Sequence, residues 1–353
     1  MENIRLSEDQ LSSVLRHPEI KKLIEEWREK RIEYHHKWRE WIDPLKIKEI
    51  SDEELKQKFE EYYKIGAGRH SFNQIYRDRI TRDIERFRNM LLYLLDESVD
   101  ITERLNEILN KNGKYYIQGV GKALVTSFLF DFNPNKYCIW NNKVEAGLGR
   151  IGWLPEKKGV TKGEYYLKIL EVIKKLVSLS SEPYNNFGDV DLALHILAVE
   201  KEGDIALKEI LGIPVQKDLG EENEYQVMER TLQDFLKKNF SKIFPSLEIY
   251  QDEESDGFEY PTSFGRIDIL TKEKNTGNFI VIELKGGKAS SDVVGQILSY
   301  MAWVEENLAD NSKVKGIIIC QDVDEKLKFA LKKTKDIEVY TFKMSFTVEE
   351  FEL

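Results

Sequence analysis

The sequence predicts two domains of different class: a helical N-terminal domain over residues 1–212 and an α/β domain with a central sheet over residues 221–353. Apolar residues recur with helical spacing through the first domain, whereas short runs with a strand period appear only after about residue 221. Between them, Ile213-Pro-Val followed by Lys-Asp-Leu-Gly-Glu-Glu-Asn is typical of a linker. A chain of 353 residues, 41% of them hydrophobic, is long enough for two separate cores.

The N-terminal domain is expected to consist of a series of amphipathic helices separated by prolines and polar turns. Its first sixty residues carry dense mixed charge with Trp27, Trp38 and Trp41. We interpret them as a helical hairpin with an aromatic seam; an interaction arm is the alternative. The periodic segments are Leu11–Trp27, Glu53–Tyr63, Arg77–Leu95, Ile101–Leu109, Gly121–Phe130, Asn142–Leu148, Glu164–Leu179 and Val190–Ala198.

In the C-terminal domain the expected order is αβββαβαβ. Apolar runs with a strand period follow a first helix and then alternate with helices. The predicted helices are Glu224–Asn239, Ser291–Leu308 and Asp324–Lys333, and the predicted strands are Leu247–Tyr250, Gly265–Thr271, Phe279–Lys285, Val314–Cys320 and Ile337–Phe342.

Charged residues interrupt two neighbouring apolar strands of this domain. Asp268 lies between Ile267 and Ile269, so it points to the face opposite these isoleucines, and Glu283 and Lys285 share a face of the next strand. A hairpin of these strands can bring two carboxylates and one ammonium group together. This is the geometry of a divalent-metal site beside a positioning lysine. The alternative is a salt bridge at the end of a sheet.

These motifs resemble the PD-(D/E)xK restriction-endonuclease-like superfamily. More closely, Gly-Arg-Ile-Asp-Ile-Leu, Val-Ile-Glu-Leu-Lys and Gln-Ile-Leu-Ser-Tyr resemble the C-terminal domain of NucS-type endonucleases, and more loosely the nuclease domain of Shedu-type phage-defence proteins. The resemblance covers about residues 221–345. It implies a restriction-endonuclease-like αβββαβ fold with a central mixed sheet.

The resemblance also implies an activity and a ligand set. Asp268, Glu283 and the backbone carbonyl of Leu284 would hold Mg²⁺, with Mn²⁺ as a substitute, and Lys285 would orient or help to deprotonate the attacking water. The expected function is metal-dependent DNA endonuclease activity in prokaryotic phage defence, restriction or DNA repair.

Further residues are carried over from the resemblance or flank the motifs. Gln296 and Glu229 match positions that approach the catalytic site in the resembled family, and their alternative is an ordinary helix surface. Arg266 and Lys288 are candidates for phosphate contacts. Gly286-Gly287 stands where related sequences often have basic residues, which puts strong electrostatic gripping of DNA at this place in doubt.

A second motif lies in the N-terminal domain. Residues 116–130, with Gly119, Gly121 and Lys122 at a Gly-Val-Gly-Lys turn before an apolar helix, resemble a helix-hairpin-helix element. Such a turn would let a DNA phosphate approach the helix N-terminus. The alternative is a glycine-rich turn inside a packed bundle. The catalytic aspartate of helix-hairpin-helix glycosylases is missing near Asn141–Asn142, so base excision is not expected.

Bulk properties bound the remaining possibilities. The net charge is −10, the two cysteines lack disulfide or metal spacing, and neither a long apolar span nor a signal-peptide core is present, so we expect a cytoplasmic protein without membrane contact. Expected partners are DNA, a second copy of the chain, and a separate motor or sensor subunit, since no Walker motif is present. The alternatives are a nucleic-acid-binding sensor that stays silent without a partner or trigger, and a metal-free interaction module.

Overall fold

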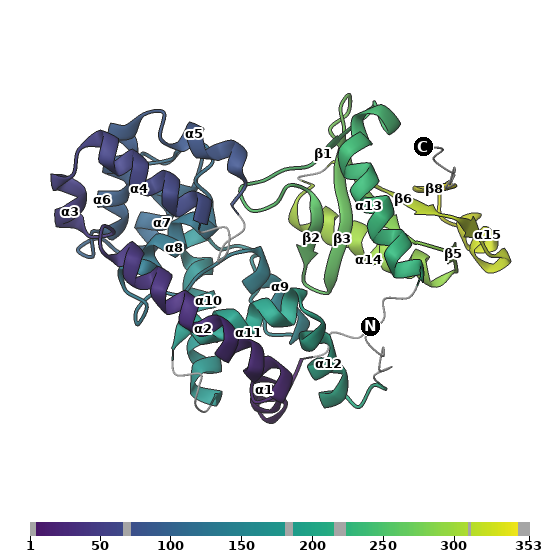
Figure 1. Ribbon diagram of the computed structural model, residues 1–353, viewed down its shortest axis with the longest axis horizontal. Helices are drawn as coiled ribbons and strands as arrows, with labels where there is room; N and C mark the ends of the chain where they lie inside the picture. The colour runs from purple at the N-terminus through teal and green to yellow at the C-terminus, as the bar shows by residue number, and fades with distance from the viewer. Residues whose placement is uncertain (1–4, 66–71, 181–185, 215–223, 310–311, 345–353) are drawn as a thin grey trace, which may run out of the picture. The chain divides into compact units, whose positions relative to one another are not determined.

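The computed structural model describes residues 5–65, 72–180, 186–214, 224–309 and 312–344 (Figure 1). The chain forms two compact units. The helical unit comprises Met1–Val215 together with the short segments Gln251–Asp256 and Pro261–Arg266, and the α/β unit comprises Gln216–Tyr250, Gly257–Tyr260 and Ile267–Leu353. The predicted linker from residue 215 onward lies largely outside the described residues.

The helical unit confirms the predicted class. A single hydrophobic core runs through it, and the most apolar helix, Phe187–Val199, is buried on nearly all sides, as expected for a helix at the centre of a bundle. Its helices are α1 (Glu8–Leu15), α2 (Pro18–Arg39), α3 (Pro44–Glu49), α4 (Asp52–Ile65), η2 (Gln74–Tyr76), α5 (Arg77–Ile80), α6 (Ile84–Leu95), α7 (Ile101–Leu109), α8 (Lys122–Phe132), α9 (Asn142–Arg150), α10 (Lys162–Leu179), α11 (Phe187–Val199) and α12 (Lys201–Ile210).

Two predicted helices are each split. The predicted Leu11–Trp27 becomes α1 and α2, because Pro18 lacks the amide hydrogen for a continuous helix and instead starts the second one. The predicted Arg77–Leu95 becomes α5 and α6, because the side chain of Asp83 accepts a hydrogen bond from Arg86 N and caps α6.

The N-terminal aromatic residues pack into the core of the helical unit. Trp38 and Trp41 are buried, and their rings meet Tyr62 of α4 at centroid distances of 5.2 and 6.0 Å. The Tyr62 ring stacks on Phe128 of α8 at 4.8 Å. The predicted aromatic seam is therefore present, and it joins the first helices to the rest of the unit instead of leaving them as a free arm.

The α/β unit contains the predicted mixed sheet. Strands follow the order β1-β3-β4-β6-β8, with β2 paired to β3; β1, β3 and β4 are antiparallel neighbours, whereas β4, β6 and β8 run parallel. The elements are α13 (Glu224–Ile243), β1 (Leu247–Ile249), β2 (Phe258–Thr262), β3 (Gly265–Glu273), β4 (Phe279–Leu284), β5 (Lys288–Ala289), α14 (Asp292–Asn307), β6 (Val314–Cys320), β7 (Asp322–Val323), α15 (Glu325–Leu331) and β8 (Ile337–Thr341).

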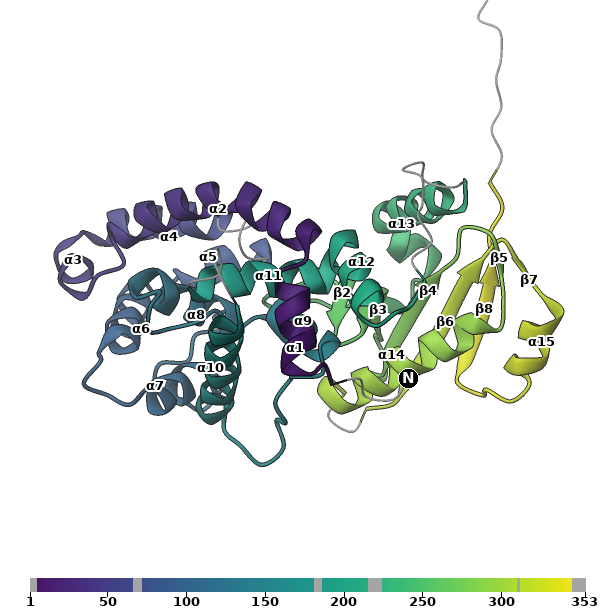
Figure 2. The ribbon, with the colours of Figure 1, turned by 90° about the horizontal axis from the view of Figure 1, so that it is seen from below.

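Helices cover both faces of this sheet (Figure 2). On β4, Ile280 and Ile282 pack with the residues of α13, whereas Phe279 and Val281 pack with those of α14. The strand reads as a continuous apolar run because both of its faces are buried. The sequence did not predict the short strands β2, β5 and β7, which have no clear period of their own.

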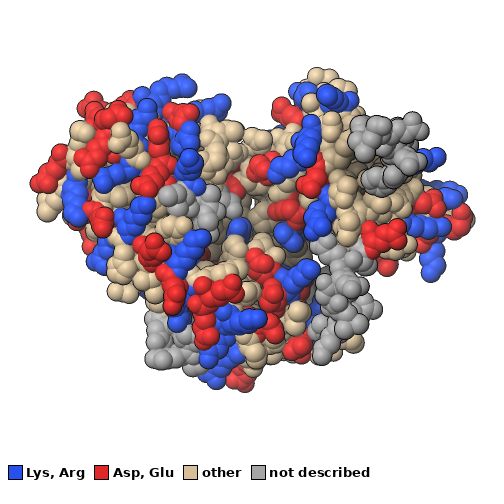
Figure 3. Space-filling model, viewed as in Figure 1, with Lys and Arg blue, Asp and Glu red and all other residues tan. Residues whose placement is uncertain are grey.

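Hydropathy and surface charge bear on contacts with membranes and nucleic acids. No helix in the described part of the chain is both long and apolar enough to traverse a bilayer. On the face that Figure 3 shows, basic and acidic side chains are interspersed. Both cysteines, Cys138 and Cys320, are buried and free, as their spacing predicted.

Candidate active site

Two antiparallel strands bring Asp268 and Glu283 together in the α/β unit. The register pairs Ile269 of β3 with Ile282 of β4, and one further step along both strands places Asp268 opposite Glu283. Directly opposed residues of an antiparallel pair project from the same face. The Oδ2 atom of Asp268 also accepts a hydrogen bond of 2.6 Å from the backbone nitrogen of Leu284. The sheet therefore fixes both carboxylates on one face, as the alternation of residues predicted.

Lys285 completes this group. Its Nζ atom lies 2.8 Å from Oε1 of Glu283, and its side chain keeps about a third of its surface exposed, whereas Glu283 is only 1% exposed. The second oxygen of Glu283, Oε2, is buried and finds no hydrogen-bond partner among the described residues. A buried carboxylate oxygen without a partner is costly unless a ligand satisfies it.

The pKa values of Asp268, Glu283 and Lys285 are shifted by burial and by the charges of their neighbours. Burial, followed by the negative charge of Glu283, raises the pKa of Asp268 well above its usual range. Burial also raises the pKa of Glu283 to about 6, against the attraction of Lys285. Burial alone would lower the pKa of Lys285, but the Glu283 carboxylate outweighs it and raises that pKa. Two carboxylates thus compete for one ammonium group.

The donors fit a hard divalent cation. Carboxylate oxygens are the ligands that Mg²⁺ prefers, and Mg²⁺ usually takes one or two of them and keeps several waters. No group of three or more His, Cys, Asp or Glu side chains is arranged to hold a metal among the described residues. A cation here would therefore depend on Asp268 and Glu283, with backbone and water oxygens completing its shell. The carbonyl of Leu284, the next residue of β4, is the backbone ligand that the sequence resemblance implies.

Glu229 of α13 also reaches this region. Its Oε2 atom accepts a hydrogen bond of 3.2 Å from Gly286 N, and its charge raises the pKa of Glu283. The neighbouring helix explains the two glycines. A Cβ at Gly286 would overlap the backbone oxygen of Tyr225, and a Cβ at Gly287 would overlap the Tyr225 ring. Gly286-Gly287 therefore allows α13 to approach the strand end.

Gln296 lies on the exposed side of α14 and is linked to the two carboxylates through a neighbouring residue. It hydrogen-bonds Tyr300, whose pKa is raised by burial, with smaller contributions from Glu283 and Asp268. Tyr300 was not among the predicted site residues. Its position four residues after Gln296, on the same helix face, is the signal that could have identified it.

Two more residues were missed. Glu259 of β2 accepts a hydrogen bond of 2.7 Å from Gln233 Nε2, and its charge raises the pKa of both Asp268 and Glu283. It is the only non-glycine residue with a positive φ, 48°, in the described ranges, and such backbone strain is common near functional sites. Nothing in the sequence marks Glu259. Gln233 lies one helical turn after Glu229 and could have been found from that spacing.

The predicted flanking cations do not join the carboxylate group in the same way. Lys288 on β5 is exposed and pairs with Asp322 of β7 at 3.5 Å. Arg266 is exposed and belongs to the helical unit. Neither placement excludes a phosphate contact at the surface, which stays a prediction.

The predicted phosphate-binding turn of the helical unit is not open in this structure. Gly119 has a positive φ of 96°, and a Cβ there would overlap Tyr76. Gly121 packs against the side chain of Glu253, and Lys122 pairs with Glu145 at 2.9 Å. An acidic segment of the same chain thus occupies the place that we expected a phosphate to take. The packed-turn alternative describes this structure better than an open DNA contact.

Comparison with known proteins identifies the class of the α/β unit. Residues 255–346 match the family model of the endonuclease NucS C-terminal domain. The C-terminal part of the chain is NucS-like, which confirms the resemblance predicted from its motifs. The match includes the two carboxylates and the lysine but not Glu229 or the helix-hairpin-helix candidate. Similarity to Shedu-type proteins stays a prediction.

Individual relatives show the same limited coverage. The endonuclease NucS of Sulfolobus acidocaldarius is 33% identical over 75 residues, which are 21% of this chain and 28% of that protein. The EndoMS–dsDNA2 complex matches 38% of this chain and 51% of its own at 20% identity, with a TM-score of 0.29. A repair endonuclease from Pyrococcus abyssi matches 35% and 50% at 26% identity, with a TM-score of 0.28. The chain therefore spans about a quarter of the curated relative and half of these structures.

Proposed function

We propose that this chain is a divalent-metal-dependent DNA endonuclease whose α/β unit hydrolyses phosphodiester bonds. The observation that carries the proposal is the pair Asp268 and Glu283, fixed on one sheet face beside Lys285, with one Glu283 oxygen buried and without a hydrogen-bond partner in the described part of the chain. A structural salt bridge would satisfy its carboxylate fully. In a pair that binds a cation, one carboxylate oxygen has no protein partner and is available to the cation, as is Oε2 of Glu283 among the described residues.

Each residue has a role that follows from its contacts. Asp268 and Glu283 would bind the cation, and the hydrogen bond from Leu284 N holds the Asp268 carboxylate in place. A divalent cation bound there would supply positive charge at the scissile phosphate and increase the acidity of a bound water. Lys285 remains protonated beside Glu283, so it is suited to hold the phosphate or the attacking water rather than to accept a proton.

The residues around this group would position it. Glu229 holds the backbone at Gly286, and Gln233 fixes Glu259 near the two carboxylates. Gln296 would act on the site through Tyr300. We propose these residues as positioning residues, because Glu229 bonds the backbone at Gly286 and Gln233 bonds the Glu259 side chain.

DNA is the proposed substrate because the matching family and relatives are described as endonucleases of the NucS type, and one similar structure is a complex with double-stranded DNA. Repair is the biological setting that these names favour. Roles in restriction or phage defence remain expectations from the motifs. Because cleavage of both strands calls for two such sites, we propose that the chain acts as a homo-oligomer.

A second candidate function is a nucleic-acid-binding sensor whose nuclease unit stays silent without a partner or trigger. The net charge of −10 and the mixed charges on the face that Figure 3 shows favour the sensor function, because neither creates a strongly positive surface for DNA. Such a protein would bind DNA in a salt-dependent manner without cutting it.

One cleavage panel separates these functions. The protein is incubated with duplex, single-stranded, mismatched and modified DNA in the presence of Mg²⁺, Mn²⁺ or EDTA. We expect metal-dependent cutting that Asp268→Ala and Glu283→Ala each abolish, whereas Glu248→Ala, an exposed β1 control, retains it. Cutting that persists in both variants would refute the proposed site. Binding without cutting, with every substrate and metal, would select the sensor.

A further inference from the structure

The segment Asp252–Asp256, here called the acidic loop, packs into the helical unit although it connects β1 to β2 of the α/β unit in the sequence. It is an ordered turn: Oδ1 of Asp252 accepts hydrogen bonds of 2.8 Å from the backbone nitrogens of both Glu254 and Ser255. This Asx-type arrangement presents the glutamate side chains outward from the turn.

Asn73 holds the backbone of the acidic loop. Its backbone nitrogen donates to the carbonyl oxygen of Glu253 at 3.0 Å, and its side-chain Nδ2 donates to the carbonyl oxygen of Asp252 at 3.1 Å. The Glu253 side chain packs against Gly121, the residue before α8. The acidic loop is thus attached by its backbone on one side and by its glutamates on the other.

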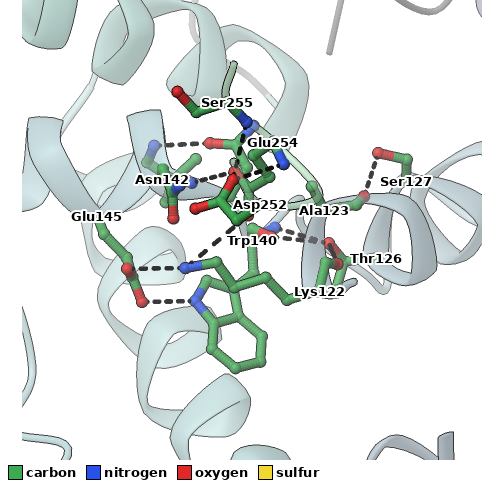
Figure 4. A network of polar contacts seen from close by, with 12 residues as sticks. Lys122, Ala123, Thr126, Ser127, Trp140, Asn142, Glu145, Asp252, Glu254 and Ser255 are labelled. Carbon is green, nitrogen blue, oxygen red and sulfur yellow. Dashed lines mark hydrogen bonds and ion pairs between the residues drawn. The ribbon is translucent and has the colours of Figure 1, made fainter. Parts of the chain in front are cut away.

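Glu254 is the buried end of this attachment (Figure 4). Its Oε2 atom accepts a hydrogen bond of 2.6 Å from the backbone nitrogen of Asn142 at the start of α9, where the helix dipole favours a negative charge. Its Oε1 atom lies 3.9 Å from Nζ of Lys122, and only 10% of its side chain is exposed. Few acidic side chains in a surface loop are covered to this extent.

Lys122 is shared, and Glu254 is the weaker of its two partners. Glu145 lies 2.9 Å from Lys122 Nζ, is also paired with Lys157 at 3.2 Å, and accepts a hydrogen bond from Trp140 Nε1 at 2.8 Å. The two lysines therefore outweigh burial and lower the pKa of Glu145 to about 2. For Glu254 burial prevails over Lys122 and raises the pKa to about 8.

Charged groups that act on Glu254 come from four segments. Lys122 is the first residue of α8, Lys143 and Glu145 lie on α9, Lys157 follows α9, and Asp252 is in the acidic loop itself. The negative charges of Asp252 and Glu145 raise the pKa of Glu254 further, and the amide of Asn142 lowers it.

We propose that the acidic loop is a releasable latch that holds the connection between β1 and β2 on the helical unit through Glu254 and opens in alkaline solution. The latch does not rest on the proposed nuclease activity, because the contacts that hold Glu254 come from Lys122 and Asn142 of the helical unit. Its opening would expose Lys122 and the start of α9.

The direction of the pH dependence follows from burial. Glu254 binds its proton more tightly in the closed latch than in the open one, so the closed form is favoured at low pH and loses stability as the pH rises from the ordinary value of 4.5 through about 8. Within this window one proton is released on opening. The opening equilibrium therefore rises by up to about tenfold per pH unit and levels off above pH 8.

Hydrogen exchange of the full-length chain tests this latch. Backbone exchange of residues 251–257 and of Asn142 is measured by mass spectrometry at pH 6.5 and 8.5, with correction for the intrinsic pH effect. We expect the opening of the wild type to rise roughly twentyfold. Glu254→Gln mimics the protonated side chain and should change by less than about twofold. Glu25→Gln removes the same charge from the exposed face of α2 and should behave like the wild type.

A second variant tests the latch if removal of the Glu254 charge does not change hydrogen exchange in the acidic loop. Glu254→Lys places a second ammonium group beside Lys122 and should release the acidic loop at both pH values while α10 and α11 keep their protection. The proposal is overturned if the wild type and Glu254→Gln show the same pH dependence, or if Glu254→Lys leaves the loop protected. Neither outcome would affect the nuclease proposal, which the cleavage panel tests separately.

Discussion

Replacing Glu283 by glutamine removes a buried negative charge that faces a second carboxylate, and we expect the metal-free protein to become more stable at alkaline pH. Glu283 is 1% exposed, and one of its oxygens has no hydrogen-bond partner within the described ranges. Without a cation the ionised side chain is therefore a cost to the fold rather than a contribution. Binding sites are often stabilised when such a charge is removed.

The magnitude follows from the pKa. Burial raises the pKa of Glu283 from 4.5 to about 6, so its protonation stabilises the fold below pH 4.5 and that contribution is lost as the pH rises through 6. The loss is about 2 kcal/mol at pH 8. A glutamine side chain does not ionise, so the variant does not lose this stability. It weakens the 2.8 Å hydrogen bond to Lys285, however, at a cost of about 1 kcal/mol. We expect a net gain of about 1 kcal/mol at pH 8 and a net loss near pH 4.5.

Urea unfolding of both proteins in EDTA, at pH 4.5 and pH 8, measures this difference. The stability of the variant relative to the wild type should rise by about 2 kcal/mol between the two pH values. Added Mg²⁺ should stabilise the wild type more than the variant, because it binds the folded protein through Glu283. A relative stability that is constant or falls with pH would refute the electrostatic account of this site.

Three further predictions concern single contacts. Gly286→Ala should destabilise the α/β unit by about 2–4 kcal/mol in denaturant titrations because its Cβ overlaps a helix backbone oxygen, whereas Gly295→Ala, with open space around it, should be neutral or stabilising by about 0.5–1 kcal/mol. Lys285→Ala should lower kcat for DNA cleavage by about a hundredfold or more. Lys288→Ala should leave kcat unchanged and should reduce the slope of log binding constant against log salt concentration by about one. Glu145→Gln should destabilise the helical unit at pH 7 by up to about 3 kcal/mol in thermal or urea unfolding, a difference that should vanish as the pH falls from 4.5 towards 2.

The part of the site that the sequence predicted depends on local periodicity. Alternation along β3 and β4 determines which face each side chain takes, and a hairpin makes the two strands neighbours, so Asp268, Glu283 and Lys285 could be grouped without a structure. Glu229 came from the family resemblance of its helix and not from periodicity. The mixed sheet itself followed from the resemblance of the motifs.

The rest of the site depends on contacts between distant segments. Nothing local indicates that Gly286 is required by a helix about sixty residues earlier, or that Glu259 turns towards the carboxylates on a strand with no clear period. The acidic loop is the clearest case. Its composition predicts a solvated surface turn, yet Glu254 is buried beside the backbone nitrogen of Asn142, at the start of α9, and Lys122 of α8.

The central claim is that Asp268 and Glu283 together bind one divalent cation beside Lys285. Calorimetric titration of the purified protein with Mn²⁺ tests this most directly, since it requires neither a known substrate nor a partner. We predict one binding event in the wild type and in Glu248→Ala that is lost in both Asp268→Ala and Glu283→Ala. Unchanged Mn²⁺ binding in either of the last two variants would contradict the claim.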